Sequence, residues 1–349
     1  MFNKKITIFL VTAFVLISYL SCSKEHPRFV SKGVYYWKTI FELDKQDRNW
    51  IKENEVSKIY TRFFDVDWEP STKQALPVGS LKILSNKISG VEIIPTIFIT
   101  NKTFLNIRDS SINDLAFKVY EKIKSQVSAF KQMEIKEIQM DCDWTEKTKE
   151  KYFSFIKYFK LYCEKENISV SATIRLHQVK YFEMTGVPPV DRGSLMFYNM
   201  TSVSDPNTKN SIFDEAVAKK YLVNFDRYPL KLDVILPAFS WGVLFRNNKI
   251  SGIINDVKIE ELSNSDNIEL LKSNLYRVVK NIYFRERYLK KNDQIRIEEI
   301  TPATTELAAE LIAPYIKNDT LVVSIYHINK EVIENYDKGD IQDIVSNFQ

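Results

Sequence analysis

The amino-acid sequence predicts a (β/α)8 barrel, and three observations lead to that prediction. Short runs of β-branched and aromatic residues alternate with amphipathic helical stretches along most of the chain. There are eight such runs, which is the strand number of this barrel. A length of 349 residues suits the fold with an N-terminal signal and one insertion. An open doubly wound sheet is the alternative, but no glycine-rich turn follows the first strand and no GKS or GKT occurs.

Strands and helices are expected to follow one another in regular order. The strands are expected at 33–37, 58–68, 92–100, 137–144, 169–178, 193–200, 232–241 and 321–328. Helices are expected at 44–56, 75–88, 112–131, 146–166, 211–226 and 304–317, with weaker signals at 179–185 and 267–290. The whole of 33–349 is thus expected to form one barrel domain.

A long segment, about 242–302, separates the seventh and eighth strands and is expected to be an insertion. Residues 245–262 predict a hairpin with a polar turn, which could reach over the barrel mouth. Residues 274–291 are expected to form a basic helix whose charged face is solvated.

The N-terminus has the order of a secretory signal over residues 1–21. Lys4 and Lys5 precede an uncharged apolar run that ends in the sequence YLSC at Cys22. A plain signal peptide or an uncleaved anchor is one interpretation. The run also resembles a lipobox, although Tyr19 replaces the usual aliphatic residue. That resemblance implies lipidation of Cys22, a polar tether over 22–32, and attachment to the outer membrane or cell surface of a Gram-negative bacterium.

Charge and cysteine content exclude several classes of partner and site. Basic and acidic residues number 49 and 45, without a block of five like charges, so nucleic acid is not an expected partner. Missing phosphate-binding patterns predict no cofactor. Beyond Cys22, only Cys142 and Cys163 remain, most simply as small buried apolar residues.

Acidic residues follow two of the predicted strands, at the end where a barrel of this type builds its active site. The second strand ends with Asp65, Asp67 and Glu69, and the fourth ends with Asp141 and Asp143. Residues two apart on a strand share a face, so each set should point the same way. Two close carboxylates in a partly dry site repel, and one of them can retain a proton while the other stays ionised.

Glycosidic cleavage needs that division between an acid and a carboxylate. We expect Asp143 as the acid, because it lies nearer the strand end, with Asp67, Glu69 or Asp141 as its partner. An alternative is that these aspartates cap the next helix, or that Asp141 is a buried partner for Arg175.

Polar and aromatic residues at the other strand ends are candidates for binding a substrate. Flat indole rings at strand ends can stack on sugars or simply pack the barrel top, and Trp241 is the best platform. The candidates are Trp68, Arg175, His177, Tyr198, Asn199, Trp241, Tyr326 and His327. Two histidines without ligand spacing do not predict a metal site, and Ser240 lacks a nucleophile elbow.

The fourth and fifth strands also carry a family resemblance. The runs IQMDCDWTEKTKEKYFSFIKYFK and ISVSATIRLHQV resemble glycoside-hydrolase-like TIM barrels of bacterial lipoproteins and, more distantly, family 18 chitinases. The distant match is the D-x-D-W run of Asp141, Asp143 and Trp144. The chitinase pattern places its acid, a glutamate, directly afterwards, but this chain has Thr145 there and Glu146 one residue late.

The resemblance implies a carbohydrate ligand, and three hypotheses stay open. One is a lipid-anchored glycoside hydrolase with Asp143 as its acid. The second is a silent barrel that captures glycan through Trp241, Trp68 and Tyr198. The third is a structural envelope lipoprotein that contacts other proteins through the insertion. The oligomeric state is not predicted.

Overall fold

The computed structural model describes residues 28–349, except 85–88, 129–133, 206–207 and 224. The predicted signal, Cys22 and most of the tether lie outside the described residues. Within the part of the chain that is described, no helix is long and apolar enough to cross a membrane.

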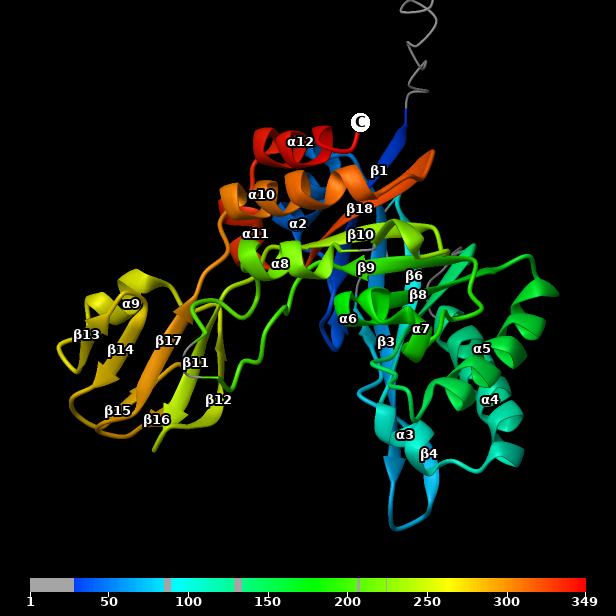
Figure 1. Ribbon diagram of the computed structural model, residues 1–349, viewed down its shortest axis with the longest axis horizontal. Helices are drawn as coiled ribbons and strands as arrows, with labels where there is room; N and C mark the ends of the chain where they lie inside the picture. Colours follow the sequence, from blue (N-terminus) through cyan, green and yellow to red (C-terminus); the bar gives the residue numbers. More distant parts are fainter. Residues whose placement is uncertain (1–27, 85–88, 129–133, 206–207, 224) are drawn as a thin grey trace, which may run out of the picture.

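Eight parallel strands form a closed barrel, which confirms the predicted fold class (Figure 1). Each expected strand matches one of them, and closure comes from β1 pairing with both β18 and β3. In chain order the strands are β1 (Phe29–Tyr36), β3 (Val56–Glu69), β6 (Glu92–Ile99), β7 (Glu137–Asp141), β8 (Ser169–Arg175), β9 (Arg192–Met196), β10 (Leu232–Pro237) and β18 (Thr320–Tyr326).

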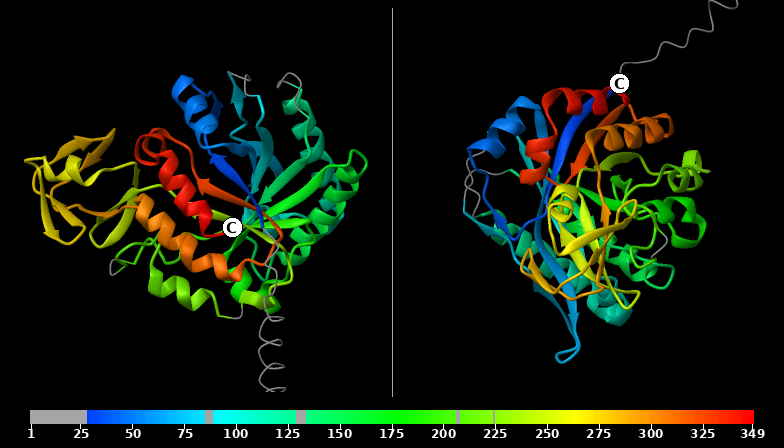
Figure 2. Two further views of the ribbon diagram at one scale, coloured as in Figure 1. Left: turned by 90° about the horizontal axis from the view of Figure 1, so that it is seen from above. Right: turned by 90° about the vertical axis from the view of Figure 1, so that its left-hand side faces the viewer.

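Helices cover the outside of the barrel, and their apolar residues pack on the strands (Figure 2). The longest are α4 (Ile112–Val127), α5 (Lys149–Glu164) and α10 (Pro302–Ile312). Shorter ones are α2 (Lys45–Glu53), α3 (Asn101–Asn106), α6 (Leu176–Lys180), α7 (Phe182–Thr185), α8 (Glu215–Tyr221), α11 (Lys330–Asn335) and α12 (Lys338–Ser346), with 3-10 turns η1 (Asp109–Ser111), η2 (Phe225–Arg227) and η3 (Ala313–Tyr315).

The helix expected at 75–88 is wrong over its described part. Strand β3 runs past the barrel rim and turns back into β4 (Gln74–Val78). A short β5 (Lys82–Ile83) then pairs with β2 (Ile40–Phe41). Pro77 and Gly79 explain the difference, because proline disrupts a helix interior and Gly79 adopts a left-handed φ of 59°.

The segment after β10 forms its own antiparallel sheet, which projects to one side of the barrel (yellow in Figures 1 and 2). Its strand order is β12-β11-β17-β14-β13, and a separate hairpin joins β15 to β16. The elements are β11 (Trp241–Arg246), β12 (Lys249–Asn255), α9 (Ile259–Ser263), β13 (Ile268–Lys272), β14 (Leu275–Val278), β15 (Ile282–Phe284), β16 (Arg287–Leu289) and β17 (Gln294–Glu298). The polar turn expected within 245–262 is the β11–β12 hairpin.

The weak helix at 267–290 and the basic helix at 274–291 are wrong, because both regions form strands. Tyr276 and Val278 are buried while Arg277 between them is exposed, which is the period-two burial of a strand. Arg285 and Glu286 have φ values of 45° and 63°, the left-handed pair that a tight two-residue hairpin turn requires.

The barrel interior is unusually polar along β7. Gln139 accepts a hydrogen bond from the Tyr35 hydroxyl at 2.7 Å and donates one to Ser194 at 3.0 Å. Tyr35 lies on β1 and Ser194 on β9, so the Gln139 side chain reaches across the barrel. By strand alternation Glu137 and Asp141 face the same interior, one toward each end. Cys142 and Cys163 are free and buried, as expected.

Candidate functional site

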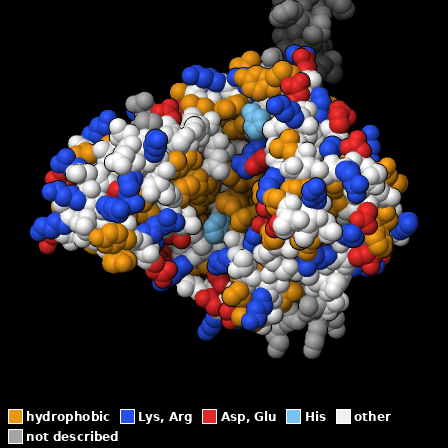
Figure 3. All heavy atoms as spheres, turned by 90° about the horizontal axis from the view of Figure 1, so that it is seen from below, with side chains coloured by type: hydrophobic (Ala, Val, Ile, Leu, Met, Phe, Trp, Pro, Cys, Tyr) orange, Lys and Arg blue, Asp and Glu red, His pale blue; other side chains and the backbone are white. Residues whose placement is uncertain are grey.

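A cleft of about 480 Å³ opens at the carboxyl ends of the barrel strands. Figure 3 shows it from below as a hollow, rich in apolar side chains, between the barrel and the smaller lobe of the insertion. Eight of the predicted site residues line it: Asp141, Asp143, Arg175, Tyr198, Asn199, Trp241, Tyr326 and His327. The sequence therefore located one rim of the molecule at which side chains from five strand ends meet.

Asp143 stands at the rim of the cleft in a two-point ion pair with Arg175. The Arg175 Nε–H donates to Asp143 Oδ1 at 2.5 Å, and Nη2 donates to Oδ2 at 3.1 Å. Fork-to-fork pairing of this kind is the strong form of a charged hydrogen bond. The sequence left Arg175 open as a buried partner for Asp141, but the Arg175 guanidinium donates its direct hydrogen bonds to Asp143.

Asp141 lies deeper in the cleft and is only 4% exposed. Its Oδ1 accepts a hydrogen bond from the Thr173 hydroxyl at 2.6 Å. Burial and, after it, the negative charge of Asp143 raise the pKa of Asp141 to about 6, while Arg175 opposes the rise. The two aspartates therefore differ in role: Asp143 is neutralised by a cation, whereas Asp141 is a carboxyl that holds its proton into the weakly acidic range.

Asp67, Trp68 and Glu69 do not line the cleft. Asp67 accepts a hydrogen bond from the Thr100 hydroxyl at 2.7 Å, and Glu69 accepts one from Ser71 at 2.7 Å. An irregularity in the β3–β6 register between Arg62 and Phe64 shifts the alternation, and β3 then leaves the barrel as a hairpin.

Arg62 and Asp65 occupy the cleft wall instead, as an ion pair. The sequence identified Asp65 as a strand-end acid but gave no sign of its pairing. Like Asp143, Asp65 is thus a cleft carboxylate with an arginine already bound to it.

Three other residues near the fourth and fifth strands also lie away from the cleft. Trp144 is fully buried beneath α7, and its Nε1–H donates to the Thr185 carbonyl oxygen at 2.9 Å. His177 is exposed on α6. Thr145, at the position of the chitinase acid, is exposed and does not line the cleft. Of this stretch, therefore, only Asp141 and Asp143 reach the site. Trp144 and Thr145 do not.

Aromatic rings form one continuous wall of the cleft. The Tyr326 ring lies 6.0 Å from Trp37, 5.3 Å from Tyr198 and 5.6 Å from Phe239, between ring centroids. Phe239 in turn lies 5.2 Å from Trp241. Tyr198 is 3% exposed, and its hydroxyl has no hydrogen-bond partner among the described residues. Buried hydroxyls are normally paired, so this one is available to a ligand.

The orientation of Trp241 is fixed by a buried ion pair of the insertion. Its indole N–H donates to Glu298 Oε2 at 2.8 Å. Glu298 is fully buried and also bonds Arg296 on Oε1 and the Ser211 backbone N–H on Oε2. With the indole nitrogen held, the ring of Trp241 is a rigid platform at the cleft.

Sequence reasoning missed an acidic pair where the insertion meets the barrel. Asp256 lines the cleft, and its Oδ1 accepts a hydrogen bond from the Asn329 side chain at 3.0 Å. Glu331 contacts Asp256. Burial, then its hydrogen bond with Asp256, raises the pKa of Glu331 to about 7, while the Ser240 hydroxyl opposes the rise. The sequence offers one hint of this pair, namely that Asp256 lies within the predicted hairpin, but that residue is far from any predicted barrel strand.

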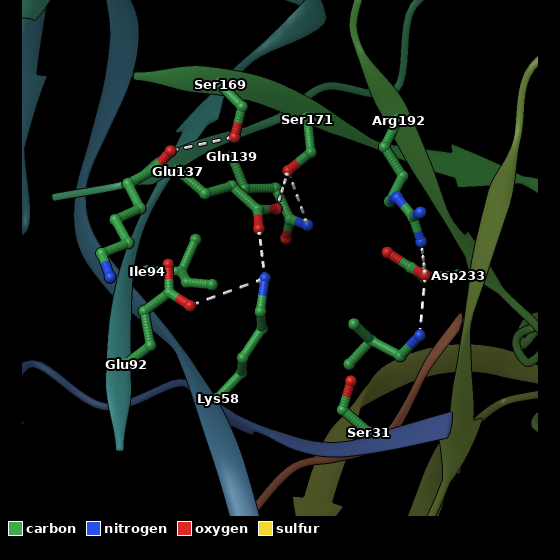
Figure 4. A network of polar contacts seen from close by, with 12 residues as sticks. Ser31, Lys58, Glu92, Ile94, Glu137, Gln139, Ser169, Ser171, Arg192 and Asp233 are labelled. Carbon is green, nitrogen blue, oxygen red and sulfur yellow. Dashed lines mark hydrogen bonds and ion pairs between the residues drawn. The ribbon is translucent and has the colours of Figure 1, made fainter. Parts of the chain in front are cut away.

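A second polar network lies at the opposite end of the barrel (Figure 4), where its residues line a pocket of about 360 Å³. Lys58 bonds Glu137 at 2.8 Å, and the Ser171 hydroxyl donates to the other oxygen of Glu137 at 2.6 Å. Arg192 donates to Asp233 Oδ1 at 2.6 Å. The backbone N–H of Val322 donates to the same oxygen at 2.8 Å. Burial raises the pKa of Asp233 to about 6, and Arg192 opposes that rise.

No metal centre emerges from the described residues: within them, no group of three or more His, Cys, Asp or Glu side chains could hold an ion. His327 lies in the cleft and His177 outside it. The polar side chains that line the cleft carry carboxyl, guanidinium, imidazole, amide and hydroxyl groups.

Comparison with known proteins gives matches to structures alone. No protein-family model and no curated protein sequence matches the chain. The spore cortex-lytic enzyme SleL of Bacillus megaterium QM B1551 is similar, with a TM-score of 0.56 and 13% identity over 92% of this chain and 75% of that chain. The Group IV chitinase of Ostrinia furnacalis has a TM-score of 0.54 and 9% identity, covering 92% of this chain and 99% of that one.

The GH18 chitinase ChiB of Flavobacterium johnsoniae is also similar, with a TM-score of 0.51 and 11% identity over 92% of this chain and 94% of that chain. At these identities the likeness establishes the fold. The chain has the barrel fold of glycan-acting hydrolases, and the resemblance to family 18 chitinases is confirmed at that level.

Proposed function

We propose that this chain is a glycoside hydrolase that binds a glycan in the cleft and cleaves it with Asp141 as the general acid. The observation that carries the proposal is the contrast between two neighbouring aspartates. Asp141 is buried at the cleft with a raised pKa, whereas Asp143 is neutralised by Arg175. A glycosidase needs such a proton-holding carboxyl to protonate the leaving oxygen. Asp141 fits the acid role better than Asp143, to which the sequence had assigned it.

Binding in this proposal comes from the aromatic wall and from the unpaired Tyr198 hydroxyl. The rigid Trp241 ring offers a stacking surface for the apolar face of a sugar. The Tyr198 hydroxyl can donate to or accept from a sugar hydroxyl. Arg175 contributes by orienting the Asp143 carboxylate, whose negative charge raises the pKa of Asp141, while the guanidinium itself opposes that rise.

A second candidate function is glycan capture without cleavage, and one observation favours it. The chitinase acid position holds Thr145, which is exposed and outside the cleft, so that mechanism lacks its proton donor here. A binder would use the same aromatic wall and would need no titrating group. The structural-lipoprotein hypothesis has no comparable observation in its support.

Lipid anchoring belongs to the same proposal. The YLSC sequence at Cys22 supports acylation there, and the polar residues that follow would separate the barrel from a membrane surface. We place the protein on the outer membrane or cell surface, with carbohydrate as its ligand. Mass spectrometry of the mature N-terminal peptide tests this: two or three acyl chains on Cys22 are expected, and an unmodified cleaved terminus contradicts it.

The decisive experiment compares wild type and Asp141→Asn on a panel of polysaccharides and aryl glycosides, by released reducing ends and by calorimetric binding. Hydrolysis predicts turnover that falls as pH rises above about 6 and is lost in Asp141→Asn with affinity kept, because Asn cannot donate a carboxyl proton. A glycan that binds both proteins equally and is never cleaved would instead establish the capture function.

A further inference from the structure

The two aspartates at the end of β7 give the proposed hydrolysis an acid, but they do not give it a carboxylate that is free of a cation. Asp141 holds the proton. Asp143 and Asp65, the cleft carboxylates on the barrel strands, are each paired with an arginine. A carboxylate whose charge is neutralised by a guanidinium is a weak base, since the cation stabilises the form that it would have to lose. In a two-carboxylate mechanism, the second group must therefore come from elsewhere.

Asp256 differs from these aspartates in its partners. Among the described residues it forms no ion pair, in contrast to Asp65 and Asp143. It is held by neutral groups: Asn329 donates to its Oδ1, and its own backbone N–H donates to the Ser240 carbonyl oxygen at 3.1 Å. Such bonds fix a carboxylate in place without pairing it with a cation.

Glu331 completes the support for Asp256. Its Oε2 is buried and has no conventional hydrogen-bond donor among the described residues, although the residue contacts Asp256. Two carboxyl oxygens in contact are stable only when one carries a proton. Burial and its contact with Asp256 raise the pKa of Glu331, so we assign the proton to Glu331, which then acts as a neutral donor that orients the Asp256 carboxylate.

Strand topology places Asp256 across the cleft from Asp141. In the closed sheet β7 is the fourth strand and β18 the eighth, so they lie on opposite sides of the barrel. Asp141 ends β7, while Asp256 is tied to Asn329, three residues beyond β18. An inverting enzyme places its two carboxyls on opposite sides of the scissile bond, roughly 6.5–9.5 Å apart, so that a water molecule fits between them, and carboxyls on opposite walls have that arrangement. The unpaired, buried Tyr198 hydroxyl on the same cleft independently indicates a ligand there.

We propose that Asp256, positioned by Glu331 and Asn329, is the general base of this cleft; this rests on the proposed glycoside hydrolysis. Asp256 takes a proton from a water molecule as the water oxygen bonds to the anomeric carbon. The glycosidic C–O bond breaks with its electron pair on the leaving oxygen, which accepts the proton of Asp141. The product sugar therefore has inverted anomeric configuration, and the insertion contributes directly to catalysis.

The central test is Asp256→Asn on a glycan that the wild type cleaves. Asn tolerates the left-handed φ of 56° at this position, so the backbone is preserved. We expect kcat to fall about 1000-fold, with the dissociation constant for that glycan within about threefold of wild type. Asp266→Asn is the matched control, an exposed carboxylate of the same insertion, and should keep full activity. Proton NMR of the first product should show inversion.

Positioning by Glu331 has its own readout. Glu331→Gln retains a side-chain donor toward Asp256 and should keep kcat within about fivefold, whereas Glu331→Ala should lose about 100-fold at an unchanged KM. A merely structural role would lower the melting temperature without this rescue by glutamine. Asp256→Gly with added azide should regain turnover and form a glycosyl azide, since azide replaces the activated water.

The outcomes separate the two proposals. A wild type that cleaves, an inactive Asp141→Asn protein and an Asp256→Asn protein within threefold of wild type would overturn the base role and leave the proposed hydrolysis standing. Retention of configuration would also overturn the base role. A wild type that binds glycan but cleaves nothing would remove the hydrolysis and the base role together.

Discussion

The two ends of the barrel carry similar carboxyl groups in opposite circumstances. At the end opposite the cleft, Asp233 has both Arg192 and a backbone N–H on one oxygen, and Glu137 has both Lys58 and Ser171. At the cleft end, the described part of the chain gives Asp141 a single hydroxyl partner and no direct cation. Burial raises the pKa of Asp233 and of Asp141 to about 6 alike.

The difference teaches that a raised pKa alone does not identify a catalytic group. Structural ion-pair networks perturb carboxyl groups as strongly as active sites do. What separates the two ends is how each carboxyl is satisfied. Asp233 has a cation and a backbone donor on one oxygen. Among the described residues, Asp141 has one hydroxyl donor, and it shares its cleft with a tyrosine hydroxyl that has no partner there. The following predictions break or sharpen that contrast, from the largest effect to the smallest.

Arg192→Ala should destabilise the fold by about 3 kcal/mol, because it leaves the buried Asp233 without its cation. Asp141→Asn should instead stabilise the fold by about 1 kcal/mol above pH 7, since it removes a buried charge that has no direct cation. Urea unfolding measures both. Arg227→Ala, which breaks the exposed pair with Glu183, is the control and should change stability by less than about 0.5 kcal/mol. If Asp141→Asn destabilised the fold as much as Arg192→Ala does, the carboxyl groups at the two ends of the barrel would have the same structural role.

Stability should fall as pH rises from about 4 to about 7. The folded-state pKa of Asp141 and of Asp233 is raised to about 6, so the native protein keeps protons that the unfolded chain has already released. Each group's contribution is present below about pH 4 and is lost as pH rises through about 6, a change of about 2–3 kcal/mol.

The measurement for this pH effect is the difference in unfolding free energy between wild type and Asp141→Asn across that range. The variant should show a shallower decline. An identical pH slope in the two proteins would mean that Asp141 titrates as in the unfolded chain.

Trp241→Phe should weaken glycan affinity about tenfold, equivalent to about 1.4 kcal/mol, because the smaller ring stacks less well and loses its tie to Glu298. Trp144→Phe provides the matched comparison. It should leave affinity unchanged and lower the melting temperature, because Trp144 is fully buried and bonded to Thr185. Calorimetric titration and thermal unfolding distinguish the two, and equal affinity losses would contradict the assignment of Trp241 as the platform.

Thr145→Glu should have the smallest effect, with turnover within about twofold of wild type. It rebuilds the chitinase sequence pattern, but Thr145 is exposed and does not line the cleft. Reducing-end assays of wild type and variant on the same glycan check this. A large gain would show that a glutamate at 145 can reach the scissile bond and would favour the capture hypothesis for the natural chain.

The sequence located the barrel strands because their signals are local. Each is a short apolar run between breakers, and the D-x-D ending of β7 was readable for the same reason. Residues 267–290 were misread because alternation and helical spacing are hard to tell apart in short segments rich in both apolar and charged residues. The helix prediction at 75–88 gave too little weight to Pro77 and Gly79.

The residues of the cleft could be predicted from the sequence only in part. Asp67 lies outside the cleft because the register of β3 is irregular. The pairing of Asp143 with Arg175 cannot be deduced from residue spacing. Asp256 was missed because its position depends on how the insertion sheet packs against the end of β18. That is a long-range packing property, and no local pattern near Asp256 encodes it.

The pairing of β1 with β18 has a consequence for biosynthesis. The first and last strands of the barrel are neighbours, so the sheet cannot close until residues near Thr320 have been made. Until then the edges of β1 and of the last completed strand stay unpaired, which invites pairing with other chains. A nascent chain stalled anywhere before β18 would present those open edges, so the last thirty or so residues decide whether translation yields a barrel or an aggregate.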